Sequence, residues 1–350
     1  MGVRRRPGGG AVSGSRWSVV GGAGFIGSHF VDRLLRDPEL ELLTVYDNFS
    51  SGRDWHLGPH LDDPRLRVVR GDVGDMAALT GAVAGHDTVL HLASNPDIAR
   101  AIVEPSVDFD QGTLLTHHVV EAARSSGARR LLYASGSGVY GDLGETEAHE
   151  DRGPLLPIST YGASKLAGEA LICSYCHLFG LRACAFRFGN VVGARQTHGV
   201  GYDFVRRLLD APERLEIMGD GTQSKSYIHV RDVVEAVLLA SARTAEPFRA
   251  YNVATGDYIS VREIAELALE CVGLRPDRTE LVFGAGDRGW KGDVPIVRLD
   301  TSRIRALGWT HTMSSREALR QSMLAMLKEH APGRAGRSPA PSLPATVRET

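Results

Sequence analysis

The sequence predicts an α/β fold built on a doubly wound parallel sheet, followed by a smaller C-terminal lobe. Two observations support this prediction. Short β-rich runs alternate with helical segments through the first half of the chain, which is the pattern of consecutive βαβ units. The first of these runs leads through a glycine-rich turn directly into an amphipathic helix, an arrangement typical of an anion-binding site at the carboxyl ends of the strands.

The elements are expected in a regular order along the chain. Runs that predict strands lie at 16–20, 42–47, 66–70, 87–92, 129–135 and 181–188. Segments with apolar residues at helical spacing lie at 25–36, 75–84, 107–126 and 161–179. Further helices are expected at 201–210, 231–243, 260–273 and 314–329. Glycine, proline and polar turns separate these later elements, so the pattern is looser after residue 190.

This pattern divides the chain into two main parts with a tail at each end. We assign 16–190 to a nucleotide-binding domain of the Rossmann type and 191–330 mainly to a substrate-binding lobe, with a strand near 250–254 returning to the main sheet. The segment 1–15 is basic and rich in Gly and Ser, and the segment 331–350 is rich in Pro, Ala, Ser and Arg. Both compositions predict disorder.

The composition argues against several functional classes. A net charge of −2 over 350 residues provides no basic field for nucleic acid. No apolar run approaches the roughly 20 residues needed to cross a bilayer, so no membrane partner is expected. Cys173 and Cys176 form a CxxC in a predicted helix without a second pair, and we interpret them as buried apolar side chains rather than metal ligands. The low cysteine content indicates a cytoplasmic protein.

The glycine-rich turn predicts a dinucleotide site. Gly21, Gly24 and Gly27 are spaced as GxxGxxG between the first strand and the first helix. Glycine lets the pyrophosphate approach the backbone N–H groups at the helix N-terminus. Asp47 ends the second strand 20 residues after Gly27, where a carboxylate accepts hydrogen bonds from the ribose hydroxyls and repels a 2′-phosphate. The sequence therefore predicts NAD rather than NADP.

Residues at the neighbouring strand ends should complete the cofactor site. Asp72 follows the third strand and is a candidate partner for the adenine amino group. The other expected cofactor contacts lie on the glycine loop and at the same sheet edge: Phe25, Ile26, Asn48, Ser51, Gly52, Val73, Leu92, Ala93 and Ser94.

Tyr161 and Lys165 form a candidate catalytic pair. They are spaced i and i+4 on a predicted helix, so their side chains share one face. A free phenol has a pKa of about 10 and is a poor base at neutral pH. We expect the neighbouring ammonium to favour the phenolate, which makes the tyrosine a usable general acid/base. The lysine can also hold the nicotinamide ribose.

At this point the chain resembles the extended short-chain dehydrogenase/reductases and, among them, the UDP-sugar 4-epimerases that act on UDP-glucose/galactose or UDP-glucuronate. The resemblance covers roughly residues 17–330. It rests on the motifs at 21–27, 46–48, 71–73, 91–93, 139–141, 161–165, 187–193, 219–223, 227–233 and 288–294. It implies that NAD is tightly held, that Tyr161 takes the proton from the sugar O4, and that a transient 4-keto sugar receives the hydride back on its other face.

The chain departs from the family pattern near the expected third catalytic group. The family's catalytic Ser or Thr corresponds to Gly136, so Ser135 or Ser137 would have to supply the hydroxyl. Val20 stands where the family usually has Thr, and Lys225 where it often has a phosphate-facing Arg. The resemblance further implies that Asn190, Lys225, Arg288 and Asp293 contact the UDP-sugar.

Sister reactions of the same superfamily are alternatives. Dehydratases resemble one another in an Asp-Glu pair just before the VYG motif, and uronate decarboxylases usually keep a Glu there, whereas this chain has Ser137 and Gly138. Epimerisation therefore ranks above UDP-glucuronate decarboxylation and NDP-glucose 4,6-dehydration. Loss of the usual hydroxyl also leaves a non-catalytic NAD-binding sensor or scaffold as an alternative. Extra apolar positions on the helices 107–126 and 161–179, with the resemblance, predict a homodimer.

Overall fold

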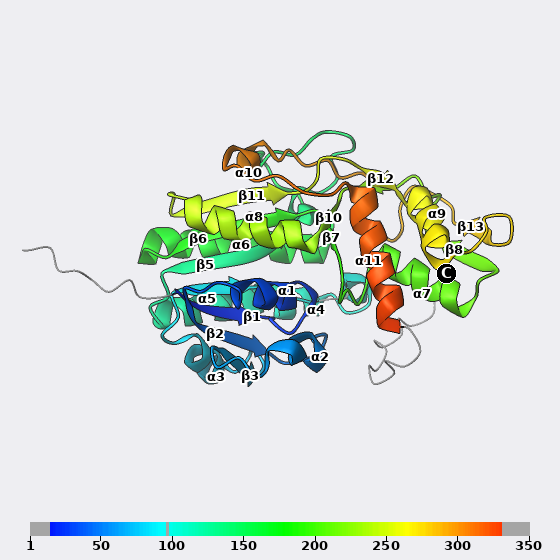
Figure 1. Cartoon of the computed structure of the whole chain (residues 1–350). Helices are drawn as coiled ribbons and strands as arrows, with labels where there is room; N and C mark the ends of the chain where they lie inside the picture. Colours follow the sequence, from blue (N-terminus) through cyan, green and yellow to red (C-terminus); the bar gives the residue numbers. More distant parts are fainter. Residues whose placement is uncertain (1–14, 96–97, 331–350) are drawn as a thin grey trace, which may run out of the picture.

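The computed structural model describes residues 15–95 and 98–330. A parallel seven-stranded sheet with the order β11-β6-β5-β4-β1-β2-β3 forms the centre (Figure 1). The strands are β1 (Ser15–Val20), β2 (Leu40–Asp47), β3 (Leu66–Arg70), β4 (Thr88–His91), β5 (Arg130–Gly136), β6 (Arg182–Phe188) and β11 (Phe248–Val253). The predicted doubly wound parallel fold is confirmed.

Helices cover both faces of this sheet. On one face α1 (Phe25–Leu34) packs with α8 (Val230–Arg243), and on the other α5 (Leu115–Ser125) lies between α3 (Met76–Val83) and α6 (Thr160–Phe179). Side chains alternate along the strands, so Val19 packs in the core under α1 and α8 while Val20 packs in the core under α3 and α5. Both valines are fully buried, as expected for a strand covered on both faces.

Short helical segments connect the strand ends to these layers. They are α2 (Asp54–Leu57), η1 (Gly58–His60), η2 (Ile98–Ile102), α4 (Ser106–Asp108), η3 (Phe109–Leu114) and η4 (Ser137–Tyr140). The sequence predicts one helix over 107–126, but a π-helical segment, η3, separates α4 from α5. Gly112 lies in this segment, where a Cβ would come within 2.5 Å of Ser164 Oγ on α6. The π-helical segment η3 thus lies where α6 packs most closely against this part of the chain.

A second layer of structure lies beyond the carboxyl ends of the strands (Figure 1). Its helices α7 (Val200–Asp210), α9 (Val261–Val272) and α11 (Ser315–His330) share one apolar core. Small sheets accompany them, pairing β7 (Asn190–Val192) with β10 (Tyr227–His229), β8 (Arg214–Ile217) with β13 (Glu280–Phe283), and β9 (Ser224–Lys225) with β12 (Ile259–Ser260). The helix α10 (Ser302–Ala306) packs near β11.

The chain crosses between the two layers more than once. After 190 it builds α7 and β8 in the second layer, returns to the main sheet with α8 and β11, and goes back with α9. The strand expected near 250–254 is β11, which pairs with β6. The predicted tails, 1–15 and 331–350, lie almost entirely outside the described residues. None of the helices in the described part of the chain is long and apolar enough to span a membrane.

Candidate active site

A cleft of about 1070 Å³ lies between the carboxyl ends of the sheet and the second layer. The glycine loop, the ends of β2, β4 and β5, the start of α6, and the segments around 190, 225 and 290 all contribute to its lining. Sequence-distant motifs therefore meet in one cavity, at the sheet edge where ligands of doubly wound folds bind.

The dinucleotide half of the cleft is built from closely packed backbone. Gly21 has φ +85°, and a Cβ there would lie 2.7 Å from Ala93 N. A Cβ on Gly27 would lie 2.3 Å from Gly21 O, so only glycine allows α1 to begin against the turn. The N-terminus of α1, which starts at Phe25, faces the space left free. This cradle fits a pyrophosphate.

Asp47 is fixed at the end of β2. Its Oδ2 accepts a hydrogen bond from Ala23 N at 2.9 Å and its Oδ1 one from Phe49 N at 2.7 Å. Burial raises the pKa of this carboxyl, and the backbone hydrogen bonds oppose that rise. Asp72 follows β3, the neighbouring strand. Asn48 Nδ2 donates a hydrogen bond to Asp72 Oδ2 at 2.9 Å, which lowers the pKa of the Asp72 carboxyl. Both carboxylates line the cleft.

Most of the predicted cofactor residues are brought together. Those that line the cleft are Gly21, Gly24, Phe25, Ile26, Gly27, Asp47, Asn48, Ser51, Asp72, Val73, Leu92, Ala93 and Ser94. Gly52 does not line the cleft. A Cβ on Gly52 would lie 2.9 Å from the Cβ of Ala23, so Gly52 packs against the glycine-rich loop outside the cleft.

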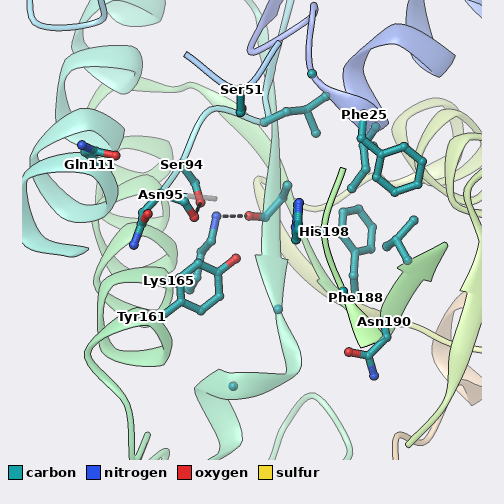
Figure 2. Close-up of a pocket in the computed structure, with 18 of the residues that line it drawn as sticks. Phe25, Ser51, Ser94, Asn95, Gln111, Tyr161, Lys165, Phe188, Asn190 and His198 are labelled. Carbon is teal, nitrogen blue, oxygen red and sulfur yellow. Dashed lines mark hydrogen bonds between the residues drawn. The ribbon is translucent and has the colours of Figure 1, made fainter. Parts of the chain in front are cut away.

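Tyr161 and Lys165 enter the cleft from the first turns of α6 (Figure 2). Ser159 caps this helix by accepting a hydrogen bond from Gly162 N at 3.1 Å. Lys165 Nζ donates to Ala134 O at 2.8 Å and lies 5.5 Å from the centroid of the Tyr161 ring. Burial lowers the pKa of Lys165 to about 8, and the nearby Asp108 carboxylate opposes this.

The pKa of Tyr161 does not follow the sequence-based expectation. Burial raises it, the Asp108 carboxylate raises it further, and a hydrogen bond with the Ser94 side chain lowers it. The expected lowering by Lys165 was wrong because the ammonium is bonded to the Ala134 carbonyl and lies beside the ring rather than at the hydroxyl. In the protein alone the phenol is therefore protonated at neutral pH.

The two serines that flank Gly136 have different surroundings. Ser135 Oγ donates to Glu169 Oε1 at 2.5 Å, inside a buried ion pair that Glu169 makes with Arg187 at 2.7 Å. Ser137 begins η4 and lines the cleft. A Cβ on Gly136 would meet nothing within 4 Å, so the position of the missing family hydroxyl is open space.

Three of the four predicted substrate residues line the cleft. Lys225 Nζ and Asp293 Oδ1 form an ion pair at 2.6 Å, and Asn190 lies near them with its amide donating to Ser226 O at 3.1 Å. Arg288 is not among the lining residues; its guanidinium donates to Asp142 Oδ2 and to Asp293 O, both at 2.5 Å. It holds the 288–293 segment against the loop that follows η4.

Sequence reasoning missed one buried group beside the catalytic pair. Asp108 is 1% exposed and accepts hydrogen bonds from Asn95 Nδ2 at 2.9 Å and from Thr160 Oγ1 at 2.7 Å. Its charge acts on both Tyr161 and Lys165. No local pattern marks it, because it comes from a segment more than 50 residues before the pair.

Comparison with known proteins places this site in a family. Residues 17–254 match the NAD dependent epimerase/dehydratase family. A UDP-glucose 4-epimerase of Mycolicibacterium smegmatis is 34% identical over 316 residues, covering 88% of this chain and 97% of the relative. A dTDP-glucose 4,6-dehydratase of an Actinoplanes species is 32% identical, with 82% of this chain and 89% of that one covered.

A solved structure of an epimerase is also similar to this chain. The crystal structure of a UDP-galactose 4-epimerase aligns with a TM-score of 0.79 and 39% identity over 90% of this chain and 100% of the other. The predicted cofactor, NAD, is confirmed by the family, and the glycine cradle and Asp47 fit it. The chain belongs to the NAD dependent epimerase/dehydratase family.

Proposed function

We propose that this enzyme is an NAD-dependent nucleotide-sugar 4-epimerase that inverts C4 of a UDP-hexose or UDP-hexuronate through a transient 4-keto sugar. One observation carries the choice of reaction: the phenol and ammonium pair is present in the cleft, while positions 137 and 138, where an elimination would draw on carboxylates, hold Ser and Gly. Similarity to the mycobacterial UDP-glucose 4-epimerase and to the UDP-galactose 4-epimerase structure supports the same choice.

Tyr161 and Lys165 have different roles in the proposed reaction. NAD, when bound, accepts and returns the hydride of the sugar C4 carbon. Tyr161 takes the proton of the C4 hydroxyl as the C–O bond becomes a carbonyl, and gives it back when the carbonyl is reduced. Lys165, charged and fixed at the Ala134 carbonyl, holds the nicotinamide ribose. The positive charge of a bound nicotinamide would favour the Tyr161 phenolate.

The diphosphate and nucleotide are assigned to the second half of the cleft. Asn190 and Lys225 offer an amide and an ammonium there, and the Lys225–Asp293 pair must open or reorganise for the ammonium to meet a phosphate. A lysine supplies a point charge to the diphosphate rather than the fork of an arginine. The open space at Gly136 admits a sugar with a larger C5 substituent, which is why a hexuronate is kept beside a hexose.

A homodimer is part of the proposal. Phe109 is 58% exposed on η3, and Leu178 and Phe179 are 71% and 53% exposed at the C-terminal end of α6. Large exposed apolar side chains of this kind are typical of a subunit interface.

A side-by-side assay of four sugars tests the reaction. The holoenzyme is incubated with UDP-glucose, UDP-galactose, UDP-glucuronate and dTDP-glucose, and the products are resolved by NMR. C4 inversion of a UDP-sugar is expected. Formation of a 4-keto-6-deoxy sugar from dTDP-glucose, as the similarity to the Actinoplanes dehydratase would suggest, or release of carbon dioxide from UDP-glucuronate, would replace epimerisation with one of the sister reactions.

A further inference from the structure

Lys165 is a buried ammonium with few polar partners. It is 4% exposed, and its Nζ donates one hydrogen bond, to Ala134 O at 2.8 Å (Figure 2). An ammonium has three N–H donors, so two of them have no protein acceptor among the residues that the structure describes. A buried charge with so few polar contacts loses most of its hydration and needs another source of stabilisation.

Charged neighbours do not supply this stabilisation by direct contact. Asp108 acts on Lys165 through its charge, but the two Asp108 oxygens accept hydrogen bonds from Asn95 Nδ2 and Thr160 Oγ1, and within the described part of the chain they form no ion pair with the ammonium. His91 on β4 is also close, and burial followed by the Lys165 charge lowers the pKa of His91 to about 3. Its imidazole is therefore neutral at neutral pH and adds no charge.

Two aromatic rings lie beside the ammonium instead. Lys165 Nζ is 5.2 Å from the centroid of the Tyr133 ring and 5.5 Å from that of the Tyr161 ring. Both distances are within the roughly 6 Å at which the negative face of an aromatic ring attracts a cation. Tyr161 carries the reacting hydroxyl, whereas Tyr133 belongs to β5 and is not among the residues that line the cleft. Tyr133 therefore faces the ammonium from outside the cleft.

Tight packing fixes the Tyr133 ring under α6. Tyr133 is 1% exposed, and its ring centroid is 5.3 Å from that of His91. A Cβ on Gly168 of α6 would lie 2.4 Å from the Tyr133 hydroxyl, so a side chain at that position would press on the ring. Burial raises the pKa of Tyr133, so the ring stays a neutral phenol with an electron-rich face at neutral pH.

We propose that Tyr133 is a positioning residue for Lys165, whose ring face keeps the buried ammonium charged and fixed at the Ala134 carbonyl. The kinetic part of this inference rests on the proposed function, in which a charged Lys165 holds the nicotinamide ribose. The ionisation of Lys165 does not rest on it.

The small number of lysines makes this ionisation directly measurable. The chain has four, which are Lys165, Lys225, Lys291 and Lys328. The NAD-loaded enzyme is labelled with carbon-13 lysine, and the Cε signals are followed by NMR from about pH 6 to about pH 10. Lys165→Arg identifies the Lys165 signal as the one that it removes.

A fluorinated series tests the ring face while keeping the shape of the ring. Position 133 is filled with phenylalanine and then with phenylalanines that carry increasing numbers of ring fluorine atoms, which withdraw electrons from the face. Tyr133→Leu removes the ring altogether. The matched control is the same series at Phe186, which is fully buried on the neighbouring strand β6 but packs in the core on the other side of the sheet.

Tyr133→Phe should leave the Lys165 titration unchanged, because the ring face is kept. The pKa of Lys165 should fall stepwise with fluorination, and by about one pH unit in Tyr133→Leu, a roughly tenfold change in the ratio of ammonium to amine, since a desolvated cation–π contact is lost. The series at Phe186 should cause no shift. In the epimerase assay, the alkaline fall of kcat should move by the same amount toward neutral pH, with KM nearly unchanged.

An unshifted Lys165 titration in the fluorinated series would overturn the proposal, as would an equal shift in Tyr133→Phe or from fluorine at Phe186. If Tyr133→Leu does not fold, the fluorinated series decides alone. If no UDP-sugar is epimerised but the titration shifts, the proposed function fails while the role of Tyr133 in Lys165 ionisation stands. If epimerisation occurs and the titration does not shift, only the role of Tyr133 fails.

Discussion

The chemistry of this enzyme depends on how a few buried side chains ionise. Lys165 is 4% exposed, and Asp108, which lies beside it, is 1% exposed. Burial raises the pKa of Tyr161 and lowers that of Lys165, so each group is displaced toward its neutral form. Sequence spacing alone predicted which residues form the pair. It could not predict their ionisation, because Asp108 and Ala134 reach them through the tertiary fold.

Replacing the phenol tests the base directly. Tyr161→Phe should lower kcat by about 10²–10⁴-fold, since the loss of a positioned general acid/base costs that much. NAD binding should persist, because the glycine cradle and Asp47 are untouched. Steady-state kinetics and NAD quantification after denaturation would measure both. An undiminished kcat would show that another group takes the proton.

The buried lysine should make stability depend on pH. Its pKa is about 8 in the fold and near 10.5 when unfolded, so between these values the unfolded chain binds more protons and stability rises with pH. We expect the free energy of unfolding of the wild type, relative to Lys165→Met, to rise between pH 8 and 10 by up to about 1.4 kcal/mol per pH unit. Urea unfolding of both proteins at each pH provides the comparison, and a constant difference would refute it.

At the scale of elements, a buried ion pair joins α6 to β6, the strand next to the edge strand β11 of the sheet. Glu169 on α6 pairs with Arg187 on β6, and Arg187 Nη1 also donates to Tyr140 Oη at 2.9 Å. Tyr140 Oη in turn donates to Asn252 on β11 at 2.8 Å. This network fixes the helix that carries Tyr161 relative to three segments of the chain. Its members are scattered through the sequence, so no local pattern could predict the pairing.

Breaking this pair should destabilise the fold. Glu169→Ala leaves the Arg187 guanidinium buried without its carboxylate, which should cost about 3–5 kcal/mol. The exposed pair of Arg275 and Asp277, whose side chains are 74% and 58% exposed, is the control, and Asp277→Ala should have little effect. Urea denaturation monitors both. Equal, small losses would mean that the buried network does not anchor α6.

Element positions were predictable where the pattern is local. Helical periodicity predicted 161–179, and the structure has Thr160–Phe179, capped by Ser159 and ended by Gly180 with φ +72°. The prediction of one helix over 107–126 was less accurate, because the π-helical segment η3 follows from packing against α6. Most of the residues predicted for the cofactor line one cleft, but Arg288 lies outside the cleft lining because Asp142, from a distant loop, binds its guanidinium.

At the scale of the whole molecule, the chain leaves and re-enters the main sheet, so the cleft is bounded by segments from both halves. The alternation of strands and helices predicted the sheet. The division at residue 190 is a simplification, since α8 and β11 pack in the Rossmann layers. Long-range pairings of this kind depend on shape complementarity between elements, which no short pattern encodes.

The proposed dimer is testable at the same scale. Leu178→Glu places a charge beside Phe179 at the exposed apolar C-terminal end of α6, so it should convert a dimer into a monomer. Sedimentation at micromolar concentration would report the mass of the wild type and the variant. Leu61→Glu is the control, because Leu61 is 59% exposed on the loop after η1. A monomeric wild type would refute the dimer.

In the proposed epimerisation, the sugar C4 carbon gives up its hydrogen and takes the same hydrogen back inside this cleft. The most direct test uses a UDP-hexose and a UDP-hexuronate carrying deuterium at C4, with the products examined by mass spectrometry and NMR. We predict a C4-inverted product that retains the deuterium at C4, formed about 10²–10⁴-fold more slowly by Tyr161→Phe. Deuterium lost to solvent, or moved to C6 of a dehydrated product, would contradict C4 epimerisation.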